Sequence, residues 1–299
     1  MNRLEFKEEV LESNLCPDNF EKIYEDFCHF QNDAIRTLNE FHRVCEKNNV
    51  RYQLAFGSLL GAVRDNGQIP WDYDIDVFVP YNEKEKLVQA LRKDLSDNYY
   101  FYCPEQDKKC RHFMMRLAPK GYKTTLLHVD VFYIIGAPEK ESERSQFETE
   151  MQKFFRLRYR KLVKYKDLPT IKSKFKALVS KFLLVTLSVA NIEKNMNVIC
   201  EKYDIKKSKV CIPVQGVYSN ISFETEKLWD TVLIKTEIGT LRITKNYDYV
   251  LSLIYGSYHK IYPLENRLNE MLVNYQNITG NKVKWDYRKG KGRYYISKY

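Results

Sequence analysis

The sequence lacks the features that mark membrane and secreted proteins. Its longest apolar run, 182–190, holds nine residues and includes a threonine and a serine, whereas a membrane-spanning helix needs about 20 apolar residues. The first residues of the chain are charged and contain no apolar segment of the kind found in signal peptides. We therefore expect a cytoplasmic protein.

Paired cysteines are also missing. The seven cysteines are odd in number and scattered, and they include no C-x-x-C pair. No histidine cluster lies near enough to them in sequence to complete a zinc site. This pattern predicts reduced, partly buried thiols in a reducing compartment rather than a disulfide framework or a structural zinc.

No internal repeat, low-complexity linker or recognised nucleic-acid-binding motif is visible, although the net charge is +10. Part of that charge lies in 151–181, where eleven lysines and arginines accompany a single acid, with apolar residues between them. Such a stretch is either a solvated helix face or a surface that contacts anionic lipid at the inner face of the cytoplasmic membrane, and both interpretations stay open. We expect no nucleic acid partner.

Hydrophobic periodicity indicates an α/β chain. It predicts strands over 50–56, 72–79, 99–102, 112–117 and 126–135, and helices over 19–49, 59–65, 84–97, 141–206 (broken near Pro169) and 246–258. Residues 208–244 look irregular and strand-like. Strands alternating with helices are typical of a sheet with helices over it. We expect one compact unit, with a catalytic core over 1–140 and a mostly helical, basic half over 141–299.

Three acids in the segment 56–80 carry the clearest chemical signal. Asp72, Asp74 and Asp76 occupy every second position, so in an extended strand their side chains share one face. Carboxylates that close together repel one another and resist burial unless a positive group lies among them. A hard divalent cation such as Mg²⁺ fits best, because it prefers oxygen ligands and often shares substrate phosphates. The pattern predicts a metal-dependent phosphoryl-type transferase.

Two further features complete the motif. Gly57 and Ser58 lie between a predicted strand and a predicted helix, where backbone N–H groups and the serine hydroxyl can hold a phosphate. Asp130 is a single acid inside a later apolar strand. This combination resembles the nucleotidyltransferase fold, in which two carboxylates of a D-x-D strand and a third from a neighbouring strand hold the metal ions.

The flanking sequence narrows the resemblance. The blocks G-S-L-L-G-A-V-R-D-N-G-Q-I-P-W-D-Y-D-I-D-V, H-V-D-V-F at 128–132 and N-Y-D-Y-V-L-S-L-I-Y-G-S-Y at 246–258 resemble the LicD family of phosphocholine and polyol-phosphate transferases, of which fukutin-type transferases are distant relatives. Two positions depart from the family pattern. Tyr73 replaces a third consecutive acid, and we expect its side chain to face away from the carboxylates. Ser257 replaces an acid in the tyrosine–glycine element.

The resemblance implies a nucleotidyltransferase-like mixed sheet flanked by helices, and a defined reaction. Family members use a cytidine diphosphate donor, often CDP-choline, and move its phosphoalcohol to a hydroxyl of a cell-surface glycan precursor such as teichoic acid, capsule or lipooligosaccharide, releasing CMP. Transfer of ribitol- or glycerol-phosphate, and nucleotidyl transfer to a small molecule or protein, remain open. A decayed enzyme that only binds nucleotide or nucleic acid is the non-enzymatic alternative.

The resemblance also assigns the acids. Asp74 and Asp76 become ligands of Mg²⁺ or Mn²⁺. Asp130 becomes a third ligand or the base that takes the hydroxyl proton. Asp72 is either an alternative metal ligand, a residue that contacts the ligands rather than the ion, or a turn residue.

Four residues are expected to contact the donor phosphates: Gly57, Ser58, Arg64 and Arg116. For Arg64 a plain surface role stays open, and for Arg116 a salt bridge. We expect His112 and His128 to be satisfied strand residues rather than catalysts.

Overall fold

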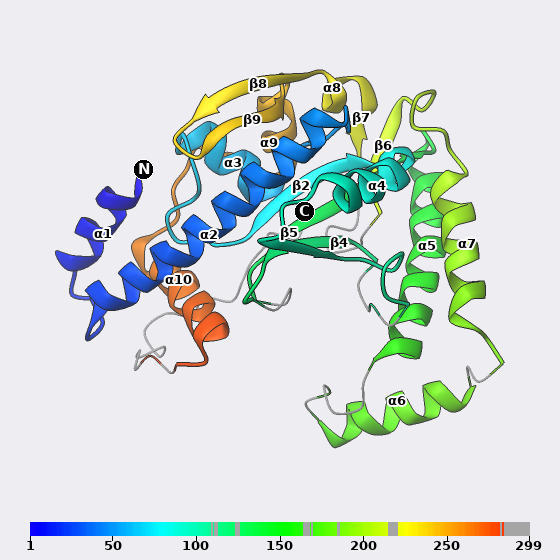
Figure 1. The fold of residues 1–299 in the computed structure, drawn as a ribbon, viewed down its shortest axis with the longest axis horizontal. Helices are drawn as coiled ribbons and strands as arrows, with labels where there is room; N and C mark the ends of the chain where they lie inside the picture. Colours follow the sequence, from blue (N-terminus) through cyan, green and yellow to red (C-terminus); the bar gives the residue numbers. More distant parts are fainter. Residues whose placement is uncertain are drawn as a thin grey trace.

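A mixed sheet of seven strands forms the centre of the fold (Figure 1) in the computed structural model, which describes residues 1–108, 110, 113–122, 126–163, 168, 170–183, 186–214, 221–281 and 283. Its main path runs β1 (Gln53–Leu54), β2 (Ile75–Pro80), β5 (Val129–Ala137), β4 (Met115–Pro119), β3 (Tyr99–Tyr102). Strand β6 (Val210–Pro213) pairs with the far end of β5, and β7 (Phe223–Glu224) pairs with β6. Only the central pair β2 and β5 is parallel among these described pairings.

Helices cover the sheet and extend from it. The long helix α2 (Phe20–Lys47) crosses one face, and α5 (Glu141–Leu162) and α7 (Val189–Glu201) run side by side at one end of the molecule (Figure 1). The other elements are α1 (Arg3–Leu11), α3 (Phe56–Arg64), α4 (Lys84–Asp94), α6 (Ile171–Leu183), α8 (Thr225–Trp229), α9 (Tyr247–Tyr255), α10 (Leu264–Thr279), the 3₁₀ turn Tyr81–Glu83 and the separate hairpin β8 (Thr231–Thr236) with β9 (Gly239–Thr244).

Helix α2 buries the apolar residues whose spacing predicted a helix in this part of the chain. Phe27, Ala34, Leu38 and Phe41 recur every three to seven residues and are fully buried, so one face of the helix packs on the core. The helix ends at Lys47, and the chain then turns at Asn49, whose φ of 53° is left-handed. That turn lets the N–H of the next residue bond to a carbonyl in the last helical turn at 2.9 Å, which satisfies an otherwise orphaned group.

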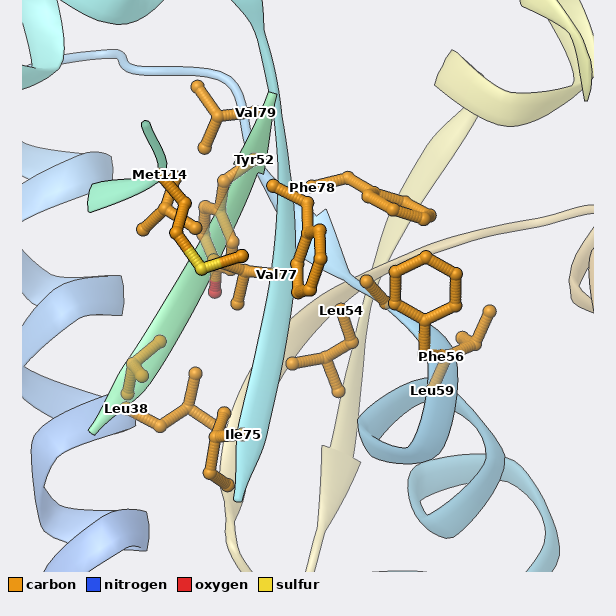
Figure 2. Close-up of a cluster of buried hydrophobic side chains, with 14 of the residues drawn as sticks. Leu38, Tyr52, Leu54, Phe56, Leu59, Ile75, Val77, Phe78, Val79 and Met114 are labelled. Carbon is orange, nitrogen blue, oxygen red and sulfur yellow. The ribbon is translucent and has the colours of Figure 1, made fainter. Parts of the chain in front are cut away.

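The two faces of β2 bury different partners (Figure 2). Val77 points toward α2, where Leu38 lies, whereas Phe78 points the other way, toward Phe56 of α3. The rings of Phe56 and Phe78 are 4.9 Å apart and edge-to-face, a favourable arrangement. Because strand side chains alternate, Asp76 shares the Phe78 face and therefore points toward the start of α3.

The predicted fold class is confirmed, but several boundaries are wrong. The strand expected from 72 begins at Ile75, the strand expected over 50–56 is reduced to two residues, and the helix expected from 59 begins at Phe56. Helices α1 and α10 were not expected. Helix α1 is short and has little apolar periodicity, whereas the buried residues of α10 do recur at helical spacing, so its sequence pattern was overlooked. His112 and most of the basic tail lie outside the described residues.

The secondary structure of the second half of the chain agrees in part with the prediction. Helices α5, α6 and α7 fall within the predicted helical region 141–206. Helix α5 ends at Leu162 and α6 begins at Ile171, whereas Pro169, the predicted break, lies outside the described residues. Strands β6 and β7 also come from this half and join the central sheet, while the division at residue 140 stays a prediction. Cys45, Cys200 and Cys211 are buried free thiols, as expected. Within the described part of the chain, no helix is both long and apolar enough to cross a membrane.

Candidate active site

The start of helix α3 builds one wall of the site. Ala55 is extended and Phe56 has a φ of 42°, so the chain turns sharply before the helix. Gly57 and Ser58 therefore lie in the first helical turn, where backbone N–H groups lack intrahelical partners. The Ser58 hydroxyl accepts a hydrogen bond of 2.8 Å from the backbone N–H of Asp76, which leaves its own proton available to a ligand.

Asp76 and Asp130 are neighbours across the central pair of strands. β2 and β5 are parallel and in register at Asp76 and Asp130, so both side chains leave the same face of adjacent strands. Phe78 and Phe132 form the next pair on that face, and both rings contact Phe56. The structure thus brings together the two acids that the sequence places 54 positions apart.

Two cationic or polar partners hold Asp130. Arg116, opposite it on β4, donates from Nε to Oδ1 at 2.8 Å, and His128 Nε2 lies 3.2 Å from Oδ2. Burial alone would raise the pKa of Asp130, but the hydrogen bond and charge of His128, with the charge of Arg116, lower it overall. Asp130 is therefore ionised at neutral pH. The salt-bridge alternative for Arg116 is the one the structure shows, while its contact with donor phosphate stays a prediction.

His128 does more than fill a strand position. It is 7% exposed, and its Nδ1 is buried with no hydrogen-bond partner among the described residues. The prediction of a satisfied strand histidine is therefore wrong for the ring nitrogen that points away from Asp130. The signal in the sequence was its place two positions before Asp130, although His128 itself precedes the first residue of β5.

Asp72 reaches the site from a turn rather than from the strand. The turn is fixed by the buried side chain of Gln31, whose Nε2 donates to the backbone oxygen of Asp72 at 2.6 Å and to those of Ile69 and Pro70. A Cβ added at Gly57 would stand 3.2 Å from Asp72 Oδ2, so glycine is what allows this close approach. The prediction that Asp72 is placed by strand alternation is therefore wrong. Its carboxylate nevertheless lies close to Gly57, in the first turn of α3.

The carboxylates of the site disfavour one another's ionised forms. Burial, followed by the charge of Asp74 and a hydrogen bond with it, raises the pKa of Asp72 well above its usual range. Burial, then the charges of Asp74 and Asp130, raises the pKa of Asp76 in the same way, although Arg116 opposes the shift. Negative charge is thus concentrated where a cation would relieve it.

Glu270 is an acid of this cluster that sequence reasoning missed. It lies on α10, and burial together with the charge of Asp74 raises its pKa from 4.5 to about 7. Its charge also contributes to the raised pKa of Asp72. The only sequence signal was its place 12 positions after the C-terminal block 246–258 that resembles the LicD family.

The direction of the Tyr73 side chain stays a prediction. Burial and the charges of Asp74 and Asp72 raise the pKa of its phenol to about 12. Tyr73 precedes the first residue of β2, so strand alternation does not govern its direction.

Arg64 has partners of its own. Its guanidinium forms a two-point ion pair with the fully buried carboxylate of Asp65, at 3.0 and 2.7 Å, and lies 5.7 Å from the ring of Trp71. Arg64 is therefore paired with Asp65 at the C-terminal end of α3, whereas Gly57 and Ser58 lie at its N-terminal end. Its contact with phosphate stays a prediction.

The donor set suits a hard cation shared with a substrate. No group of three His, Cys, Asp or Glu side chains in the described chain is close enough to form a metal site by itself. Mg²⁺ does not require one, because it is commonly held by one or two carboxylates together with substrate phosphates and water. The mutually repelling carboxylates of Asp72, Asp74 and Asp76 supply only oxygen ligands, which fits that ion.

Comparison with known proteins gives a consistent result. Residues 49–177 match the family described as LicD/FKTN/FKRP, nucleotidyltransferase domain. The chain is 26% identical over 252 residues to the lipopolysaccharide cholinephosphotransferase LicD of Haemophilus influenzae, which covers 78% of this chain and 91% of that protein. It is 44% identical over 63 residues to human ribitol 5-phosphate transferase FKRP, covering 20% of this chain and 12% of that protein. An uncharacterized protein of Rickettsia prowazekii is 39% identical over 54 residues, or 18% of this chain and 20% of that protein.

Proposed function

The chain carries a LicD-family nucleotidyltransferase domain over residues 49–177, and we propose that it is a phosphotransferase that acts on cell-surface glycans. In its specific form, the enzyme uses Mg²⁺ to move phosphocholine from CDP-choline to a hydroxyl of a glycan precursor and releases CMP. The similarity to the cholinephosphotransferase of Haemophilus influenzae extends over most of both chains and supports the choline donor.

One observation carries the proposal: Asp76 and Asp130 are register partners on the only described parallel strand pair, beside the first turn of α3. Carboxylates aligned next to free backbone N–H groups can hold both a cation and the phosphate oxygens that it neutralises. Phosphoryl transfer needs little more from a protein than this positioning and charge neutralisation.

Two of the three acids Asp74, Asp76 and Asp130 would hold the Mg²⁺ together with donor phosphates and water. The ion, when bound, would supply charge neutralisation for the diphosphate of the donor. Asp130 suits the part of a ligand better than that of a base, because Arg116 and His128 keep its pKa low. A carboxylate with a depressed pKa is a weak proton acceptor at neutral pH.

The remaining groups would orient the donor and move the proton. The Ser58 hydroxyl and the backbone N–H of Gly57 would bind a donor phosphate. An acceptor hydroxyl oxygen would then bond to the distal phosphorus while the bond to CMP breaks. Glu270, whose pKa of about 7 is close to the working pH, suits the acceptance of the hydroxyl proton.

Ribitol phosphate is a second candidate for the transferred group. It is supported by the similarity to human ribitol 5-phosphate transferase, which covers a short segment but has a higher sequence identity. The acceptor would be a glycan or lipid-linked glycan, and the reaction would take place in the cytoplasm where CDP donors are made available. Glycerol phosphate and nucleotidyl transfer are further outcomes of the same assay.

Incubation with CDP-choline, CDP-ribitol, CDP-glycerol and nucleoside triphosphates, in the presence of a glycan acceptor fraction, tests the proposal. We expect CMP release and labelled acceptor with a CDP-alcohol, abolished by EDTA and restored by Mg²⁺. Asp76→Asn should lower turnover by about 100-fold or more. Asp230→Asn, at a half-exposed acid paired with Lys245, is the matched control and should keep full activity. Pyrophosphate release without CMP, or full turnover in Asp76→Asn, would overturn the proposal.

A further inference from the structure

Helix α6 presents an apolar face that no described part of the chain covers. Ile171, Phe175, Leu178 and Val179 are 87%, 65%, 60% and 40% exposed. Large apolar side chains are seldom exposed in such a group on one helix. In Figure 1 this helix lies beyond the ends of α5 and α7, away from the central sheet.

The exposed residues form a continuous stripe. Their spacing of four, three and one positions is the spacing that aligns side chains along one face of an α-helix. Ala177, which falls on the opposite side of α6, is buried, and α6 contacts α5. The helix therefore packs on the body by one side and presents the apolar stripe on the other.

The charge on α6 has a single sign. The helix sequence I-K-S-K-F-K-A-L-V-S-K-F-L contains four lysines and no acid. By helical periodicity, Lys172 falls along one edge of the apolar stripe and Lys174 along the other, while the side chains at 176 and 181 lie outside the described ones. Apolar side chains bordered by lysines match the layering of a bilayer surface, with acyl chains beneath phosphate groups.

We propose that α6 is an interfacial helix that docks this protein on an anionic lipid surface, with Phe175 and Leu178 inserted among the acyl chains and the lysines on lipid phosphates. A second copy of the chain is a poorer occupant, because a symmetric contact would bring the lysine edges of two identical helices together. The inference concerns a surface on the helical half and does not depend on which donor the enzyme uses.

Co-sedimentation of the full-length protein with vesicles tests this surface. Wild type should bind phosphatidylglycerol vesicles at low salt, more weakly at high salt, and phosphatidylcholine vesicles little. Phe175→Ser with Leu178→Ser should weaken binding by at least about tenfold through lost apolar burial. Lys172→Gln should weaken it by about fivefold.

Matched controls separate this helix from the general positive charge of the protein. Leu4→Ser removes an apolar side chain that is 62% exposed on α1, and Lys235→Gln removes a surface charge on β8; neither should change vesicle binding. Unchanged circular dichroism and CMP release in the α6 variants would show that they are folded.

Three results would overturn the inference. Wild type that binds neither kind of vesicle is one, and α6 variants that bind as well as wild type are another. The third is a wild type that forms a dimer in solution and binds no vesicles, while the Phe175→Ser, Leu178→Ser variant is a monomer. That result would assign the stripe to a second copy of the chain.

Discussion

Replacing Glu270 by glutamine should stabilise the metal-free protein at neutral pH. Glu270 is held near Asp74, and burial together with that charge raises its pKa from 4.5 to about 7. A carboxyl whose folded pKa lies above its unfolded pKa binds its proton more tightly in the folded state. Its contribution to folding is therefore most favourable at low pH and is lost as the pH rises from about 4.5 to 7.

The size of the effect follows from the two pKa values. A difference between 4.5 and about 7 corresponds to at most about 3 kcal/mol of folding free energy. Above pH 7 the ionised Glu270 imposes the whole of this cost, while an amide at the same position imposes none of it. Asp72 and Asp76 also have raised pKa values, so wild type keeps part of its pH dependence after the substitution.

Urea unfolding of metal-free protein between pH 5 and pH 8 measures this difference. We expect Glu270→Gln to exceed wild type by about 1–3 kcal/mol at pH 8 and by much less at pH 5. Glu265→Gln, the same substitution on the same helix, is the matched control and should follow wild type at every pH. If the curves for Glu270→Gln and wild type run parallel, Glu270 does not interact with the acids and the reasoning fails.

Three other substitutions test separate parts of the site. His128→Ala should lower turnover about 10- to 100-fold, because it removes a partner of Asp130; unchanged turnover in a donor assay would contradict this. Gly61→Ala should lower the unfolding free energy by about 1–3 kcal/mol in urea, since its Cβ would stand 2.6 Å from a backbone carbonyl oxygen, and a gain in stability would refute the close approach. Gln31→Leu should destabilise the turn that carries Asp72, with turnover falling more than tenfold; wild-type kinetics would show that the turn is held in another way.

The sequence predicted the core elements that depend on their own periodicity. Helix α2 was predicted nearly to the residue, because its buried positions recur at a period close to 3.6, and the bounds of strand β3 were also predicted. Helix α10 was missed although Leu268, Met271, Leu272 and Tyr275 recur at helical spacing and are buried. What its local pattern does not give is the partner of that face, since α1 and α2 lie more than 200 positions away in the sequence.

The sequence predicted that Asp76 and Asp130 lie near one another, but not how the acids are positioned. Period-2 alternation suggested that Asp72, Asp74 and Asp76 share a strand face, whereas the strand begins at Ile75. Only Asp76 obtains its direction from the strand.

Asp72 is brought to the same place by a turn that Gln31 fixes from helix α2 and that Gly57 admits at close range. A buried polar side chain is costly unless its hydrogen bonds are satisfied. The three carbonyl oxygens that Gln31 Nε2 contacts all belong to this turn, whereas Gln31 Oε1 has no hydrogen-bond partner among the described residues. The spacing of the acids is therefore consistent with two different geometries. What selects between them is a glutamine some forty positions earlier, whose burial nothing in the local sequence reveals.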